Sequence, residues 1–443
     1  MRKFLLAVAI SICSGIIAVA FSVSDAALVA KRTVLDNGLV LLTSQQRSLP
    51  MVSIEVLMDS GSRYDGANQE GVANLVARLL TYGTKRRSAL QISDTVDFIG
   101  ASLSASCGED VAAISLTILK KDLATGLDLL ADILMASTFP QEEMNRQKQA
   151  VIAGIRAREE SPGSIAQRRF AAALYPKSPY GRPVEGSEAS VKAISQADLQ
   201  EFYQRFYRPN RAIMAVVGDI SEDEIIQALN QSLRSWPKGE ARGRPLVPTT
   251  LGEAQVIRVN KDLTQANIIL GQNGVGRENP DYYAIQVMNY ILGGGGFSSR
   301  VMDTIRNERG LAYSVYSYFS AERERGTFEL VMQTKNETAL EAIRLARTEI
   351  RRIREESVTD EELSDAKDYL IGSFPLRFDT NRRVAAFLVQ VEFYQLGLDY
   401  PERYSGLIQK VKREDVERVA RQYLQPDKFI TVIVGDQKKI GEN

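Results

Sequence analysis

An arginine and a tyrosine in the second half of the sequence have side chains that could assist acyl-transfer chemistry. Arg306 and Tyr313 lie in the stretch IRNERGLAYSVYS, which follows a run of four glycines, Gly293, Gly294, Gly295 and Gly296. A guanidinium and a phenol are donors that can stabilise the negative charge growing on a carbonyl oxygen in a transition state. The residues alone favour a structural role, in which Arg306 pairs with Asp303 and Tyr313 packs in a strand over residues 312–319.

A second segment, in the first half, predicts a helix that carries no metal-ligating side chain at positions 74, 77 and 78. Residues 61–84 read GSRYDGANQEGVANLVARLLTYGT, which predicts a loop leading into a helix near Glu70. Asn74 and Arg78 are four residues apart and share a helix face, with Ala77 beside them. Arginine cannot be deprotonated and would repel a dication. The sequence contains no histidine, which is the commonest catalytic base and zinc ligand.

Together the two segments resemble the insulinase/pitrilysin-like zinc peptidases, which include the mitochondrial processing peptidases. In that family the first helix carries His-x-x-Glu-His, a later helix carries a third ligand, and the second half carries a Gly-rich loop and an Arg–Tyr element. The resemblance covers nearly the whole mature chain, and the two signatures occur in the family's order.

The resemblance implies that this chain binds no zinc. The two histidine positions match Asn74 and Arg78, and the glutamate position matches Ala77. The third ligand should fall within residues 151–155, which read VIAGI and hold no acid. We therefore expect no cofactor in this chain.

The second signature is retained, and this asymmetry is informative. Arg306 and Tyr313 match the residues that hold substrate and stabilise the oxyanion in the family, and Gly293–Gly296 match its substrate-binding loop. The resemblance thus implies a non-catalytic subunit that completes the chamber of a zinc-bearing homologous partner. An extended peptide would be the substrate, held by strand addition to a sheet edge.

Two alternatives have no role in catalysis. The chain could be a structural or assembly subunit, as are the core proteins of the cytochrome bc complex, or a peptide-binding protein of the cell envelope. A chain that had decayed into a scaffold should have lost both signatures, which favours the partner-subunit hypothesis.

Several elements must position these residues. Periodicity predicts amphipathic helices over residues 121–137, 140–160, 338–355 and 359–374, and an apolar helix from about Tyr282. Alternation from Val52 to Met58 predicts a half-buried strand. Because helices and strands do not alternate regularly, we expect an α+β fold of two homologous halves. Each would be an antiparallel sheet with helices on one face, forming a clam-shell.

An internal repeat supports the two halves. Residues 198–219 and 415–436 both read as a helix, a proline-containing turn, a buried strand and a Gly-Asp turn. A stretch rich in Gly, Pro, Arg and Thr near residues 238–254 marks the boundary. We expect domains over residues 27–240 and 255–443.

Composition and the N-terminal segment limit the partners and the cellular location that we expect for the protein. The 443 residues are 44% hydrophobic, and Lys+Arg and Asp+Glu balance at 55 each, so nothing favours nucleic acid or an anionic membrane. A basic start, an apolar stretch and a small-x-small site before Ala27 predict a signal peptide over residues 1–26 and a periplasmic protein. An uncleaved N-terminal anchor is the alternative.

Overall fold

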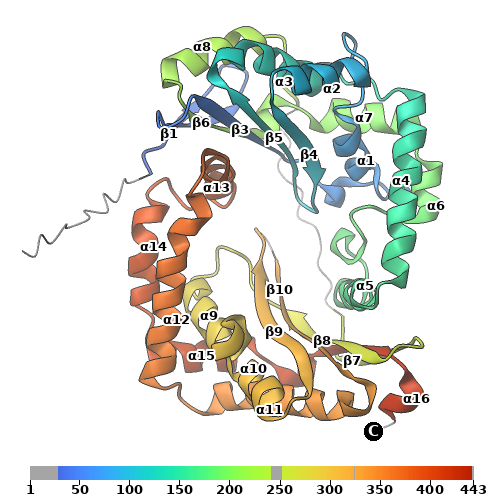
Figure 1. Ribbon diagram of the computed structural model, residues 1–443, viewed down its shortest axis with the longest axis vertical. Helices are drawn as coiled ribbons and strands as arrows, with labels where there is room; N and C mark the ends of the chain where they lie inside the picture. The colour runs from blue at the N-terminus through green and yellow to red at the C-terminus, as the bar shows by residue number, and fades with distance from the viewer. Residues whose placement is uncertain (1–27, 241–251, 324, 442–443) are drawn as a thin grey trace, which may run out of the picture.

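The computed structural model describes residues 28–240, 252–323 and 325–441 of the chain, so the predicted signal segment lies outside the described residues. Two lobes stack along the long axis of the molecule, each built on one sheet (Figure 1). In the first half the strands are β1 (Lys31–Val34), β2 (Val40–Gln45), β3 (Met51–Met58), β4 (Ser102–Cys107), β5 (Ala112–Leu119) and β6 (Ala212–Gly218). Its helices are α1 (Val72–Leu79), α2 (Ala89–Phe98), α3 (Leu123–Ala136), α4 (Gln141–Glu160), α5 (Pro162–Leu174), α6 (Glu188–Ala193), α7 (Gln196–Phe206) and α8 (Glu222–Ser232).

The second half repeats this succession with one strand fewer. Its strands are β7 (Gln255–Asn260), β8 (Gln265–Asn273), β9 (Ala312–Ala321), β10 (Gly326–Lys335) and β11 (Ile430–Gly435). Its helices are α9 (Tyr282–Asn289), α10 (Arg300–Met302), α11 (Ala339–Glu355), α12 (Asp360–Ser373), α13 (Asn381–Phe393), α14 (Tyr400–Gln409), α15 (Arg413–Tyr423) and α16 (Gln437–Ile440). The four amphipathic helices predicted by periodicity correspond to α3, α4, α11 and α12.

The two sheets have matching topologies, with strand orders β1-β2-β6-β3-β5-β4 and β7-β11-β8-β10-β9. The α+β class and the two-lobed architecture are confirmed. One detail differs from the expected antiparallel sheets, because β2 pairs with β6, and β7 with β11, in parallel. A long helical crossover precedes β6 and β11, and such a connection allows a strand to return in parallel.

The predicted repeat occupies equivalent places in the two sheets. β6 follows α7 and β11 follows α15, and each strand lies between one parallel and one antiparallel neighbour. Gly218-Asp219 and Gly435-Asp436 stand at the ends of these strands. The backbone of Gly218 has φ +148, and a Cβ there would lie 2.1 Å from the Met51 carbonyl oxygen.

The halves exchange one helix each. α5, from the first half, packs on β8 and β11 of the second sheet, where its Phe170 and Leu174 join Ile269 and Val432 in one apolar cluster. α13, from the second half, packs on β3 and β6 of the first sheet. Helices therefore cover both faces of each sheet in part, where the sequence predicted one covered face. For the same reason β3 is buried on both faces and not half-buried.

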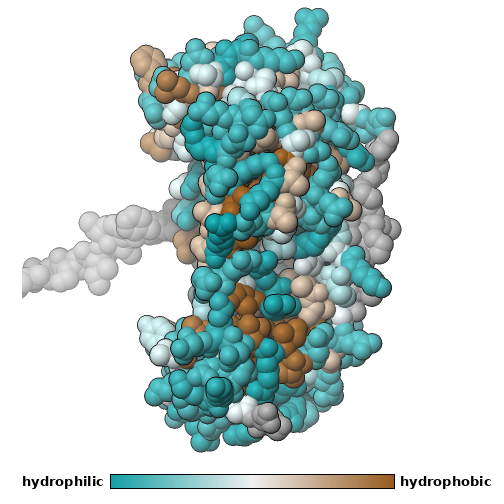
Figure 2. Space-filling view, turned by 90° about the vertical axis from the view of Figure 1, so that its right-hand side faces the viewer, coloured by the Kyte–Doolittle hydropathy of each residue, from teal (hydrophilic) through white to brown (hydrophobic). Residues whose placement is uncertain are grey.

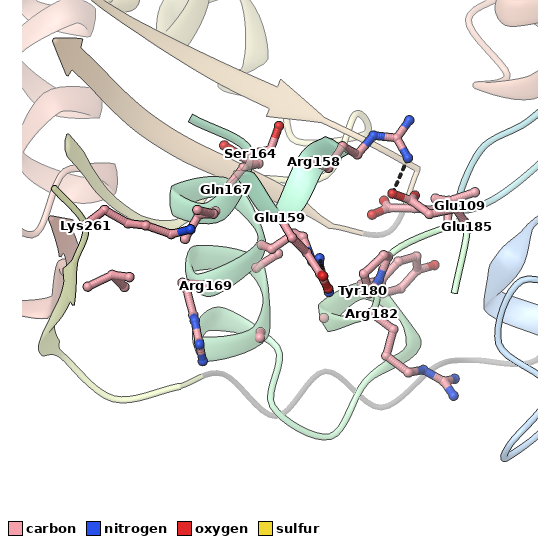
Figure 3. Close-up of a pocket in the computed structure, with 18 residues that line it drawn as sticks. Glu109, Arg158, Glu159, Ser164, Gln167, Arg169, Tyr180, Arg182, Glu185 and Lys261 are labelled. Atoms are coloured by element: carbon pink, nitrogen blue, oxygen red, sulfur yellow. Dashed lines mark hydrogen bonds and ion pairs between the residues drawn. The ribbon is translucent and has the colours of Figure 1, made fainter. Parts of the chain in front are cut away.

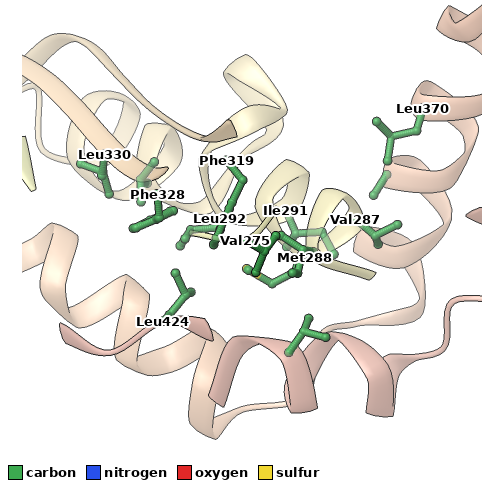
Figure 4. Close-up of a cluster of buried hydrophobic side chains, with 14 of the residues drawn as sticks. Val275, Val287, Met288, Ile291, Leu292, Phe319, Phe328, Leu330, Leu370 and Leu424 are labelled. Atoms are coloured by element: carbon green, nitrogen blue, oxygen red, sulfur yellow. The ribbon is translucent and has the colours of Figure 1, made fainter. Parts of the chain in front are cut away.

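The largest hydrophobic cluster of the described residues includes the core on the outer face of the second sheet. In Figure 4, Leu292 of the α9 region lies beside Phe319 of the sheet, and Val287 lies on the side toward Leu370 of α12. On the side of the molecule shown in Figure 2, much of the hydrophobic surface gathers at the seam between the lobes. Within the described residues, no helix is both long and apolar enough to cross a membrane.

Candidate functional site

The helix that would carry a zinc motif, α1, is fixed at its start by one carboxylate. Asp65 accepts hydrogen bonds from the backbone N–H groups of Gly71 (2.7 Å) and Ala73 (3.0 Å), which would otherwise lack helical partners. Gly71 has φ +96 and packs against the Glu185 carbonyl, so a side chain there would be strained and would clash. Asp65 is only 8% exposed, and burial raises its pKa to about 7 against the opposing effect of these two bonds.

The three positions on α1 that match the zinc motif do not fit a metal ion. Asn74 is half-buried, Ala77 is buried and Arg78 is exposed. The Arg78 guanidinium donates to the Gln147 side-chain oxygen on α4 at 3.3 Å. The Arg78 guanidinium thus reaches toward α4, where a zinc ligand would also lie. It is positively charged and has no acceptor atom, so it cannot bind a metal cation.

The later helix supplies no ligand either. Within residues 151–155 of α4, Val151, Ile152 and Ile155 are buried, while Ala153 is exposed and Gly154 is half-buried. Across the parts of the chain that the structure describes, no three His, Cys, Asp or Glu side chains gather as a metal site would require. The packing of α1 on α4 is retained, but the donors are absent.

The Gly-rich turn is held against an edge strand. α9 continues into a π-helix over Tyr290–Gly294, and Asn289 exchanges two hydrogen bonds with Ser317 of β9, at 2.8 and 3.2 Å. A Cβ on Gly293 would lie 2.5 Å from the Ser317 hydroxyl, so this glycine is required by packing. Gly294 and Gly296 are exposed. The substrate-binding role predicted for the four glycines stays a prediction.

Arg306 and Tyr313 are brought together, and with them a residue that sequence reasoning missed. The Arg306 guanidinium carbon lies 4.6 Å from the centre of the Phe297 ring and 5.5 Å from that of Tyr313. Phe297 is 69% exposed and Tyr313 is 78% exposed. The signal for Phe297 was its place directly after the glycines.

The alternative pairing of Arg306 with Asp303 is wrong. Asp303 accepts a hydrogen bond from Asn307 at 3.2 Å, and within the described residues Arg306 makes no ion pair. Tyr313 does lie on a strand, but on its exposed side. β9 is the last strand of its sheet, so one edge of its backbone has no strand partner among the described residues.

The two signatures remain separate in this chain. Arg78 and Asn74 belong to α1 of the first lobe, whereas the cluster of Phe297, Arg306 and Tyr313 belongs to the second. In the part of the chain described, no hydrogen bond or ion pair joins one set to the other.

Comparison with known proteins agrees with this geometry. A model described as insulinase (peptidase family M16) matches residues 40–188, and one described as peptidase M16 inactive domain matches residues 193–370. An uncharacterized zinc protease of Streptomyces coelicolor is 27% identical over 91% of this chain and 89% of its own. A protein of Helicobacter pylori named non-peptidase homolog YmxG is 24% identical over 99% of this chain and all of its own.

Solved structures show the same architecture. The crystal structure of a peptidase M16 inactive domain from Pseudomonas fluorescens has a TM-score of 0.87 and 29% identity, covering 92% of this chain and 98% of that one. A protease from Helicobacter pylori shares the fold, with a TM-score of 0.84 and 21% identity, covering 92% of this chain and 99% of that one. From its two family signatures, its fold and these matches, the chain belongs to the insulinase (peptidase M16) family, as a member without the His-x-x-Glu-His motif.

Proposed function

We propose that this chain is the non-catalytic subunit of a heteromeric zinc peptidase. It would pair with a homologous subunit that carries His-x-x-Glu-His and the zinc, and would bind an extended peptide for that partner to cleave. The observation that carries the proposal is the exposed cluster of Phe297, Arg306 and Tyr313, kept in a chain whose own metal positions are Asn74, Ala77 and Arg78. A zinc-bearing partner would give these donors a metal site to act beside.

The chemistry of the cluster suits a peptide backbone. Arg306 and Tyr313 are donors that could meet a carbonyl oxygen of the substrate. β9 is the last strand of its sheet, and its backbone could hold the same peptide by main-chain hydrogen bonds. Tyr316, which is 43% exposed, lies on the same strand.

The test is reconstitution with a candidate partner subunit. The chain alone should cleave no peptide, and the complex should be active. Replacing both donors, Arg306→Ala with Tyr313→Phe, should lower kcat/KM by about a hundredfold or more, the scale of a lost oxyanion donor, while co-purification persists. Arg309→Ala, on an exposed residue of the same turn, is the matched control and should change little.

Other outcomes decide against the proposal. Activity of the isolated chain would overturn it. Full activity of the complex with both donors replaced would favour the structural or assembly role instead. A chain that co-purifies with no zinc-bearing homologue would favour a stand-alone peptide-binding protein.

We also propose a periplasmic location, supported by the targeting pattern of residues 1–26. Cell fractionation and N-terminal sequencing of the purified protein test this. A mature chain beginning at Ala27 is expected, and a protein retained in the cytoplasm would contradict the proposal.

A further inference from the structure

A small, polar cavity lies where the two halves meet. It has a volume of about 230 Å³ and is bounded by α5, the tip of the β4–β5 hairpin and the β9–β10 hairpin. It shares Glu109, Gln167, Ala171 and Tyr180 with a larger cavity of about 750 Å³. Figure 3 shows the larger cavity beside α5, with Lys261 opposite and the ion pair between Arg158 and Glu185 at its rim. The small cavity is thus an inner recess of the large one.

A buried carboxylate in the recess is incompletely hydrogen-bonded. Glu329 of β10 is only 2% exposed. Its Oε1 accepts hydrogen bonds from Thr327 at 3.0 Å and Gln167 at 3.2 Å. Its Oε2 is buried and, apart from the nearby Tyr318 hydroxyl, has no hydrogen-bond partner among the described residues. A buried carboxylate oxygen without its full set of partners is costly, and such an atom points to something absent from the protein alone.

A donor in the same recess is also incomplete. The Arg325 side chain is 9% exposed, forms an ion pair with Glu109 and stacks on the Tyr180 ring at 3.7 Å. Its Nε is buried and makes no hydrogen bond within the described chain. Arg325 lies in the β9–β10 turn directly before β10, and both Arg325 and Glu329 line the recess. A molecule bound in the recess could therefore meet both groups.

We propose that this recess binds a small zwitterion, a free amino acid or a dipeptide, whose ammonium group meets Glu329 Oε2 and whose carboxylate accepts from Arg325 Nε. The Glu329 carboxylate and the Arg325 guanidinium carry opposite charges, so a ligand that carries both charges can hydrogen-bond to both groups at once. A purely cationic or purely anionic ligand would bond to one group and leave the other without that bond in a buried site. This inference does not depend on the proposed role of Arg306 and Tyr313, whose residues line neither cavity.

The volume sets the size of the ligand. About 230 Å³ corresponds to roughly seven or eight waters at about 30 Å³ each. An amino acid with a small side chain, or a dipeptide of two small residues, has a comparable number of non-hydrogen atoms. A longer peptide would have to extend into the larger cavity.

Calorimetric titration of the full mature chain tests the charge requirement. Alanine and alanyl-alanine are the zwitterionic probes, and they also separate the amino acid from the dipeptide. N-acetylalanine and alaninamide each keep only one charge. We expect a heat of binding for at least one zwitterion and none for the single-charge analogues. Binding by neither zwitterion, or equal binding by the analogues, would overturn the inference and leave ordered water as the occupant.

Substitutions locate the site. Glu329→Gln keeps the shape of the side chain and should weaken the binding zwitterion by about tenfold or more, the loss expected for one hydrogen bond to a charged group. Glu159 lines the larger cavity but not the recess. The control variant Glu159→Gln should therefore bind the zwitterion as tightly as the parent protein does. Unchanged affinity in a folded Glu329→Gln variant sinks the proposal. If that variant does not fold, Arg325→Lys and the panel of analogues on the unmodified protein decide.

Discussion

Arg306 is held in place by aromatic rings and not by a carboxylate. The faces of Phe297 and Tyr313 attract the guanidinium, at about 0.5–1 kcal/mol for an exposed site. A carboxylate partner would have occupied the N–H groups, whereas rings position the cation and leave its donors available to a substrate. Arg78 shows the opposite arrangement, because its donors are directed at Gln147 of the neighbouring helix.

Asp65 makes the stability of the first lobe dependent on pH. Because burial raises its pKa from 3.8 to about 7, the folded protein holds a proton that the unfolded chain releases between about pH 4 and about pH 7. The free energy of unfolding should therefore fall as pH rises through that window, by a few kcal/mol. In Asp65→Asn this fall should be largely absent, which denaturant unfolding at several pH values would measure.

Asp94→Asn provides the control for Asp65, since Asp94 lies exposed on α2. That variant should keep the pH dependence of the parent. If Asp65→Asn keeps it as well, another buried group is responsible and the interpretation of Asp65 is wrong.

At the scale of elements, local periodicity predicted where the helices lie in the sequence, but it did not predict which sheet each helix packs on. The helices over residues 140–160 and 359–374 were visible because apolar residues recur at the helical period, and Thr359 with Glu362 forms the capping box. The apolar stripes of α5 and α13 did not reveal which sheet they cover, because the hydrophobic effect is not directional. The recess at Glu329 likewise depends on residues distant in sequence, such as Gln167.

The packing of α1 on α4 should accept a zinc ion if ligands are restored. Gln147 faces Arg78, and Gly154 lies two turns further along the same face of α4. A Cβ on Gly154 meets nothing within 4 Å. The variant Asn74→His/Arg78→His/Gly154→Glu should therefore bind about one zinc ion per chain, measured by metal analysis after dialysis.

The matched control for this graft carries Ala153→Glu in place of Gly154→Glu, on the exposed position one residue away. It should bind zinc no better than the two histidines alone. Equal zinc content in both triple variants would show that α4 does not supply the third ligand from this face.

The exchanged helix α5 depends on a glycine in the sheet that it covers. A Cβ on Gly271 of β8 would lie 2.5 Å from the Phe170 ring and 2.6 Å from the Phe328 carbonyl oxygen. Gly271→Ala should therefore lower the free energy of unfolding by about 1–3 kcal/mol, as overpacking does. Gly372→Ala on α12, where a Cβ meets nothing within 4 Å, should leave it unchanged or raise it by up to about 1 kcal/mol. Denaturant titration compares the two, and equal stability would contradict the close packing.

For the whole molecule, the exchange of α5 and α13 means that neither sheet is covered by its own half alone. Phe170 and Leu174 of the first half pack against Ile269 and Val432 of the second. In turn, α13 of the second half packs on β3 and β6 of the first. The ion pair of Glu109 with Arg325 joins the hairpin tips of the two sheets. From these contacts we expect the predicted domains, residues 27–240 and 255–443, to behave as one cooperative unit.

The two halves should therefore fold together and not separately. The full chain should unfold in a single transition, whereas residues 28–240 or 252–441 expressed alone should show no cooperative unfolding, since each exposes an apolar helix face and an apolar sheet face. Co-expression of the two fragments should restore a complex with the full chain's circular dichroism and one transition. A fragment that unfolds cooperatively by itself would show that the exchanged helices add contacts to already stable domains, and the lobes could then move apart without unfolding.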